Sequence, residues 1–162
     1  MGIESGATFS ADRRCRYRLW RVWDRTKPRV CFVCLNPSTA DEDEDDTTVS
    51  ICREFAVRWG YGALEVVNLF AFMATDPAVM LAARNPIGGP NNTAHILRAC
   101  READRIVVAW GDAGTHMNQA AAVLPLIRAI KPVYCLRQNT SGQPHHPLYI
   151  AWDTQPVLYQ GP

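Results

Sequence analysis

Residues 35–41 have the sequence Leu-Asn-Pro-Ser-Thr-Ala-Asp and follow the apolar run Val30 to Cys34. A short apolar run bounded by turn residues indicates a buried strand. Asn-Pro-Ser-Thr directly after it indicates that the strand enters a tight polar loop. In α/β proteins, ligands bind in the crevice beyond the carboxyl ends of the strands. We therefore treat Asn36 and Ser38 as candidates for positioning a water or a substrate. The alternative is that they only form the turn and cap a helix.

Strand and helix patterns alternate along the rest of the chain. The expected strands are residues 16–23, 29–35, 63–69, 105–110 and 132–136, with a short one near Tyr149 and Ile150. The expected helices are residues 47–59 (capped by Asp46, ended by Gly60), a short one opened by Pro77, one from Asn91 or Asn92 to about residue 102, and residues 115–130. This order predicts one α/β domain, residues 1–162, folded as a three-layer α/β/α sandwich with a mainly parallel central sheet.

The bulk composition is that of an ordinary globular protein. The chain has 162 residues, of which 48% are hydrophobic and 20% charged, which is enough to form a sizeable core. No apolar run approaches the roughly 20 residues that a membrane helix needs. Residues 1–12 contain no apolar signal-peptide core. We expect a cytoplasmic monomer with no membrane partner.

The six cysteines could in principle include metal ligands. Cys31 and Cys34 have a metal-like spacing, and Cys100 and Cys135 could complete a set of four thiolates. A strand, however, directs residues three positions apart to opposite faces. We therefore favour reduced cysteines in the core over an iron–sulfur or zinc site, and we expect no metal and no cofactor.

The net charge of +1 conceals two segments of opposite sign. Residues 13–29 carry eight basic side chains and one acidic one, interleaved with aromatic residues, a pattern that suits a nucleic-acid backbone. The candidate DNA contacts are Arg16, Arg18 and Arg21. The equally weighted alternative is a solvated strand with arginines outward and aromatics inward. Residues 41–46 are all acidic and lack the spacing of an EF-hand, so we favour a solvated loop that supplies a helix cap over a cation site.

Polar elements follow four of the apolar runs, and a parallel sheet would bring them to one rim. They are Asn36-Pro37-Ser38, Asn68, Gly111-Asp112, and residues 139–147 with His145 and His146. The chain has no Walker loop, no G-x-G-x-x-G and no Ser/His/Asp order. Amides together with histidine suit the binding of a neutral heterocycle and the stabilisation of developing charge, and they do not suit phosphoryl transfer.

The order of these motifs resembles the uracil-DNA glycosylase superfamily. The counterparts are Leu35-Asn36-Pro37-Ser38, Val66-Val67-Asn68, Ala109-Trp110-Gly111 and His146-Pro147-Leu148. More closely, residues 16 to about 150 resemble a bacterial and phage family known as domain of unknown function 1643. Its hallmarks are present as Leu-Asn-Pro-Ser-Thr-Ala-Asp, Trp-Gly-Tyr-Gly, Asn-Leu-Phe-Ala-Phe, Ala-Trp-Gly and His-Pro-Leu-Tyr.

The glycosylase resemblance implies roles for these residues. Asn36 would orient a water toward the sugar carbon, and His146 would donate a hydrogen bond to a base carbonyl as it becomes anionic. Asn68 would bind the edge of the base with one donor and one acceptor. The other implied substrate contacts are Pro37, Ser38, Phe70, Gly111 and Pro147, and Asp41, Asp45 or Asp46 would assist the water or the cation. Tyr149 would wedge the duplex; its alternative role is core packing.

The leading interpretation is therefore a glycosylase-like protein that recognises a nucleobase in single- or double-stranded DNA. It would hydrolyse the N-glycosidic bond of an unusual or modified pyrimidine. Two alternatives stay open: an enzyme that acts on free nucleotides or nucleosides in a modified-base pathway, and a non-catalytic DNA-binding module on the same fold. Action on DNA predicts that the arginines of residues 13–29 face the same rim as Asn36.

Overall fold

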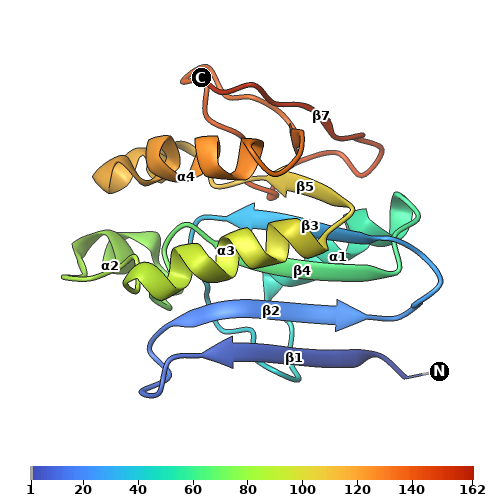
Figure 1. Ribbon diagram of the computed structural model, residues 1–162, viewed down its shortest axis with the longest axis horizontal. Helices are drawn as coiled ribbons and strands as arrows, with labels where there is room; N and C mark the ends of the chain where they lie inside the picture. The colour runs from blue at the N-terminus through green and yellow to red at the C-terminus, as the bar shows by residue number, and fades with distance from the viewer. Residues whose placement is uncertain (1) are drawn as a thin grey trace.

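A seven-stranded sheet with helices against both faces organises residues 2–162, the part of the chain that the computed structural model describes (Figure 1). The strand order is β1-β2-β4-β3-β5-β6-β7. The strands are β1 (Glu4–Phe9), β2 (Arg16–Val22), β3 (Arg29–Cys34), β4 (Ala63–Asn68), β5 (Arg105–Val108), β6 (Val133–Cys135) and β7 (Val157–Leu158). The predicted α/β class is thus confirmed.

The sheet is mixed, and the prediction of a mainly parallel sheet is wrong. Only β4, β3, β5 and β6 run parallel, while β1, β2 and β7 are antiparallel to their neighbours. The short connection between β1 and β2 explains why these two edge strands are antiparallel. A parallel pair needs a crossover of about a dozen residues, and the β1–β2 turn is shorter than that. The sequence analysis missed β1, whose Gly and Ser weaken its strand pattern.

The helices match the predictions from the sequence except at the starts of α3 and α4. They are α1 (Thr47–Arg58), α2 (Pro77–Ala82), α3 (Pro90–Glu102), the 3₁₀ segment η1 (Asp112–Asn118) and α4 (Gln119–Arg128). The Asp46 carboxylate caps α1 as predicted. The predicted cap of α3 is wrong, because Gly89 occupies that position and the Asn92 amide is buried in the core. The single helix predicted for residues 115–130 is interrupted, because Met117 and Asn118 have positive φ.

The short strand expected near Tyr149 and Ile150 is also wrong. Tyr149 has a φ of 62°, which is incompatible with a strand. The last strand, β7, forms further along the chain at Val157–Leu158 and pairs with β6.

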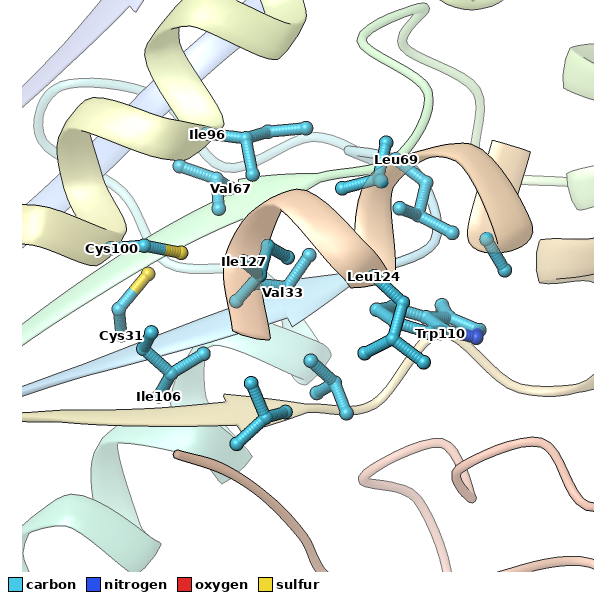
Figure 2. Close-up of a cluster of buried hydrophobic side chains, with 14 of the residues drawn as sticks. Cys31, Val33, Val67, Leu69, Ile96, Cys100, Ile106, Trp110, Leu124 and Ile127 are labelled. Atoms are coloured by element: carbon cyan, nitrogen blue, oxygen red, sulfur yellow. The ribbon is translucent and has the colours of Figure 1, made fainter. Parts of the chain in front are cut away.

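Successive residues of β3 face two separate cores. Cys31 and Val33 pack with α3 and α4, whereas Phe32 and Cys34 pack with α1 on the other face. Figure 2 shows the first core, with the sulfurs of Cys31 and Cys100 pointing toward one another. All six cysteines are free thiols, and Cys15 is the one that is not buried. The prediction that the Cys31 and Cys34 side chains lie on opposite faces is confirmed.

Two arginines of β2 point inward and hold the acidic segment of residues 41–46. Arg21 is 2% exposed; its Nε donates to the Asp45 carboxylate at 2.8 Å and its Nη2 donates to the Asp41 carbonyl at 2.7 Å. Arg16, also 2% exposed, donates from Nη1 to the Ala40 carbonyl at 3.2 Å. Together with the exposed pair between Arg13 and Glu42, Arg21 therefore neutralises part of the acidic segment within the fold.

This burial corrects two interpretations of the basic segment. Neither Arg16 nor Arg21 is available to a phosphate backbone, and the alternative of a strand with all arginines outward is wrong as well. Arg18 is engaged too, since it forms ion pairs with the buried Glu65 and with Glu102.

Residues 2–162 lack two features that would point to a membrane or a metal ion. No helix in this range has both the length and the apolar character that crossing a membrane requires. Nor does this range bring together three His, Cys, Asp or Glu side chains that could hold a metal ion.

Substitution of Arg21 by Met should lower the free energy of unfolding by about 2 kcal/mol, because it removes the buried guanidinium that donates to the Asp45 carboxylate and to the Asp41 and Glu44 carbonyls, while Arg53 still pairs with Asp45. Urea unfolding of both proteins measures the change. Arg25→Met is the matched control: Arg25 pairs with Glu4 at an exposed site, where an ion pair contributes little. Equal effects of the two substitutions would contradict the assigned role of Arg21.

Candidate functional site

A cleft of about 510 Å³ opens beyond the carboxyl ends of β3 and β4. Its walls come from the loop after β3, the start of α1, the loop that leads into α2, and the loop around His146. In Figure 1 this rim lies toward the left, where α2 and the turn between β1 and β2 are found. The structure thus brings Asn36, Ser38 and His146 to one cleft, although Asn36 and His146 are 110 positions apart in the sequence.

Asn36 is held in one orientation by the loop that it begins. Its Nδ2 donates to the Pro37 carbonyl at 3.1 Å and to the Ala74 carbonyl at 2.9 Å. Both amide hydrogens are therefore used, and the oxygen Oδ1 is the atom that remains for a ligand or a water. A hydrogen bond of 3.3 Å from Ser38 to Thr75 joins the same two loops. This arrangement can orient a water but cannot deprotonate it, since an amide is not a base.

His146 is fixed as a neutral hydrogen-bond donor. The backbone N–H of Leu148 donates to its Nδ1 at 3.1 Å, so the ring proton of the neutral imidazole is on Nε2. Burial, with a smaller effect from neighbouring His145, lowers the pKa of His146 below its usual value. At neutral pH this ring therefore offers Nε2–H to the cleft without a positive charge.

The loop that carries His146 is tied to the ends of β5 and β6. The N–H of Gly111, whose φ is 72°, donates to the Pro144 carbonyl at 2.8 Å. Trp110 donates from Nε1 to Gln143 at 2.9 Å. Asp112 accepts hydrogen bonds from Ser141 and Asn139, which lower the pKa of its carboxyl group. Gly111 and Pro144 thus meet, as the predicted convergence of strand ends requires.

A cavity of about 20 Å³ adjoins the cleft and shares Asn36 and Ser38 with it. Asn68 lines this cavity together with Arg16. Within residues 2–162, neither Asn68 Nδ2 nor Arg16 Nε has a hydrogen-bond partner, although both atoms are buried. We refer to this cavity as the floor of the cleft. Its two unsatisfied donors suit an oxygen atom.

Arg16 remains a cation in this setting. Burial lowers the pKa of its guanidinium to about 10, while the nearby Asp46 carboxylate acts in the opposite direction. At neutral pH the floor therefore has a positive charge that water does not screen.

Three of the predicted substrate contacts do not line the cleft. Phe70 is fully buried, with its ring 5.6 Å from that of His116. Pro147 is buried in the loop, and Gly111 acts through its backbone bond to Pro144. Phe70 and Pro147 thus support the site from behind rather than touch a ligand. Pro37, in contrast, lines the floor.

Tyr149 is almost fully solvent-exposed, at 94%, and extends from the loop that follows His146. The alternative of core packing for this ring is therefore excluded. Arg14 is exposed on the same rim, where its carbonyl accepts a hydrogen bond of 2.9 Å from the Met73 N–H, next to the cleft. Arg14 lies in the basic segment, but nothing in the sequence distinguished it from its buried neighbours.

The acidic residues of the cleft wall are already bound by other groups. Asp45 accepts hydrogen bonds from Arg21 and Arg53, and Asp46 accepts them from the Val49 and Ala40 N–H groups. Two arginines offset the charge of Asp45, whereas backbone N–H groups bind Asp46, whose negative charge lies beside the cleft. The sequence did not indicate Thr47 and Thr48, which line the cleft because Asp46 starts α1 there.

The stability of the protein should depend on the pH through His146. Because its pKa is lower in the folded than in the unfolded chain, the unfolded state binds more protons below about pH 6.5, and the free energy of unfolding falls there. His146→Gln should make the free energy of unfolding fall less between about pH 7.5 and about pH 5.5. Part of the decrease should remain, because burial also lowers the pKa of His95. Urea unfolding at the two pH values measures this. An unchanged loss in the variant would contradict a buried, neutral His146.

Comparison with known proteins identifies the family of this chain. No curated protein and no solved structure gives a significant match. Residues 16–148 match the family described as "Protein of unknown function (DUF1643)". The match extends from the start of β2, with Arg16, to the loop after His146, so it contains both sides of the cleft and its floor. The chain is therefore a member of the DUF1643 family.

Proposed function

We propose that the cleft binds a nucleobase and that the protein hydrolyses the N-glycosidic bond of an unusual or modified pyrimidine in DNA, on a glycosylase-like α/β/α architecture. The observation that carries the proposal is the pairing of Asn36 and His146 in one cleft. Asn36 presents a fixed acceptor, and His146 presents a fixed neutral donor. The cleft volume of about 510 Å³ lies in the range of small-molecule sites.

These two groups match the charges that develop in the reaction. Cleavage passes through an oxocarbenium-like sugar, while negative charge builds on the leaving base. The Asn36 oxygen would accept a hydrogen bond from a water and direct its oxygen to the sugar carbon. The His146 Nε2–H would donate to the base oxygen that becomes anionic. The negative charge of Asp46 would favour the cationic sugar.

The rim supports DNA as the substrate through Tyr149 and Arg14. An exposed aromatic ring next to the cleft can stack in place of a base that has left the helix, which offsets part of the cost of extrusion. Arg14 is placed to contact a phosphate. The net charge of +1 gives the protein no general electrostatic attraction for DNA, so these local contacts would have to provide the affinity.

A second candidate is hydrolysis of free nucleosides or nucleotides. The inward orientation of Arg16 and Arg21 favours it, because it removes two of the three arginines expected to contact DNA. The chemistry of Asn36 and His146 would be the same for both substrates. The two candidates differ in whether Tyr149 and Arg14 affect the reaction.

Base release is the experiment that tests the proposal. The wild type is incubated with oligonucleotides that contain uracil, 5-hydroxymethyluracil or other modified pyrimidines, single- and double-stranded, and with the matching free nucleosides. Asn36→Ala and His146→Ala should each lower the rate at least a hundredfold, since each removes a transition-state contact. His116→Ala is the control histidine, because it packs against Phe70 and does not line the cleft.

Each outcome of this assay has one interpretation. Release from DNA that both variants lose supports the glycosylase, and release from nucleosides alone supports the second candidate. DNA binding that falls with salt, with no base released from any substrate, would support the non-catalytic binding module and contradict the proposed reaction.

Tyr149→Ala should weaken binding to duplex DNA about tenfold or more, and Tyr149→Phe should not, because stacking needs the ring and not the hydroxyl. Fluorescence anisotropy with a duplex that contains an abasic position measures both variants. An Ala variant that binds as tightly as the wild type would contradict a role for Tyr149 in holding an extrahelical base.

A further inference from the structure

We propose that Arg16 is a specificity-determining residue: its Nε–H and the Asn68 Nδ2–H together bind one oxygen of the ligand, an exocyclic carbonyl of the base. This inference rests on the proposed function, since it assigns the part of the base that enters the floor of the cleft. It commits the site to bases with a carbonyl group at that position and against bases with an amino group there.

The first support is that both donors are buried and unsatisfied. Arg16 is 2% exposed and Asn68 is 1% exposed, and neither Arg16 Nε nor Asn68 Nδ2 has a partner within residues 2–162. Buried polar groups in native proteins are almost always hydrogen-bonded, because leaving a donor unpaired is costly. Two such donors on one cavity indicate that a ligand or a water completes them.

The second support is the size of the cavity. A volume of about 20 Å³ is close to the 10–15 Å³ that one water molecule needs, so a single oxygen fits and a base ring does not. The ring would remain in the larger cleft, and its carbonyl would pass between Asn36, Ser38, Asp46 and Thr48, which line both spaces.

The third support is the fixed position and charge of Arg16. Its Nη1 donates to the Ala40 carbonyl at 3.2 Å, and its Nε is a buried donor without a partner. A guanidinium in a buried site donates a stronger hydrogen bond than a neutral group, and the bond strengthens as the oxygen becomes anionic. An amino group would instead direct its own hydrogens at two N–H donors, which is repulsive.

The test is a titration of the ¹⁵N-labelled wild-type protein with free uracil and, separately, with 2,4-diaminopyrimidine, which has amino groups in place of both uracil carbonyls. The titrations are followed through the arginine Nε–H and asparagine side-chain signals. Arg16→Lys assigns the Arg16 signal and retains the charge, and Arg14, exposed at the rim, is the internal control. Uracil should shift the Arg16 Nε–H and Asn68 amide signals and leave that of Arg14 unchanged. 2,4-Diaminopyrimidine should bind at least about tenfold more weakly, and Arg16→Lys should remove the difference.

The outcomes separate this inference from the proposed function. If uracil shifts the His146 signals but neither Arg16 nor Asn68, the cleft binds a base and the floor holds only a resident water, which overturns the role of Arg16 alone. Equal affinity for uracil and 2,4-diaminopyrimidine overturns it as well. If neither base shifts any signal of the cleft, both this inference and base binding by the cleft are wrong.

Discussion

The contacts that two buried arginines of β2 make with residues 40–45 are the interaction on which the site depends. Arg21 binds the Asp45 carboxylate and the carbonyls of Asp41 and Glu44, and Arg16 binds the carbonyl of Ala40. A chain segment with six consecutive acidic residues would otherwise repel itself and remain extended in water. Held in this way, it places Asp46 at the start of α1 and forms one wall of the cleft. Charge neutralisation within the fold and the shape of the site therefore have the same origin.

The chemistry of the site follows from how its loops are fixed. Asn36 uses both amide hydrogens on neighbouring carbonyls, and His146 accepts from the Leu148 N–H, so each group has one remaining function. Neither requires a strong base or a metal to act. Such preorganisation is what a site needs when it stabilises charge rather than transfers protons. The unsatisfied donors of the floor fit the same principle, because they are already oriented before a ligand binds.

The sequence predicted the parts of this structure that local patterns determine. The central strands, the Asp46 cap of α1 and the convergence of Gly111 with the 139–147 loop follow from periodicity, capping and strand order. It did not predict β1, the interruption of the last helix or the inward turn of Asn92, because pairing and backbone strain depend on distant contacts. The burial of Arg16 and Arg21 was missed for the same reason. The acidic residues that bind Arg21 are 20 to 24 positions away, and a charge pattern does not reveal which arginine each of them contacts.

The central claim is that a base lies in the cleft between the loop after β3 and the loop of His146. A crystal structure of the protein soaked with 2′-deoxyuridine tests it most directly. The account predicts that the base lies in this cleft, with one carbonyl directed at Asn68 and Arg16 and the sugar facing Asn36. A nucleoside bound instead in the neighbouring open groove along α1, beside Glu54 and Trp152, with the cleft empty, would contradict it.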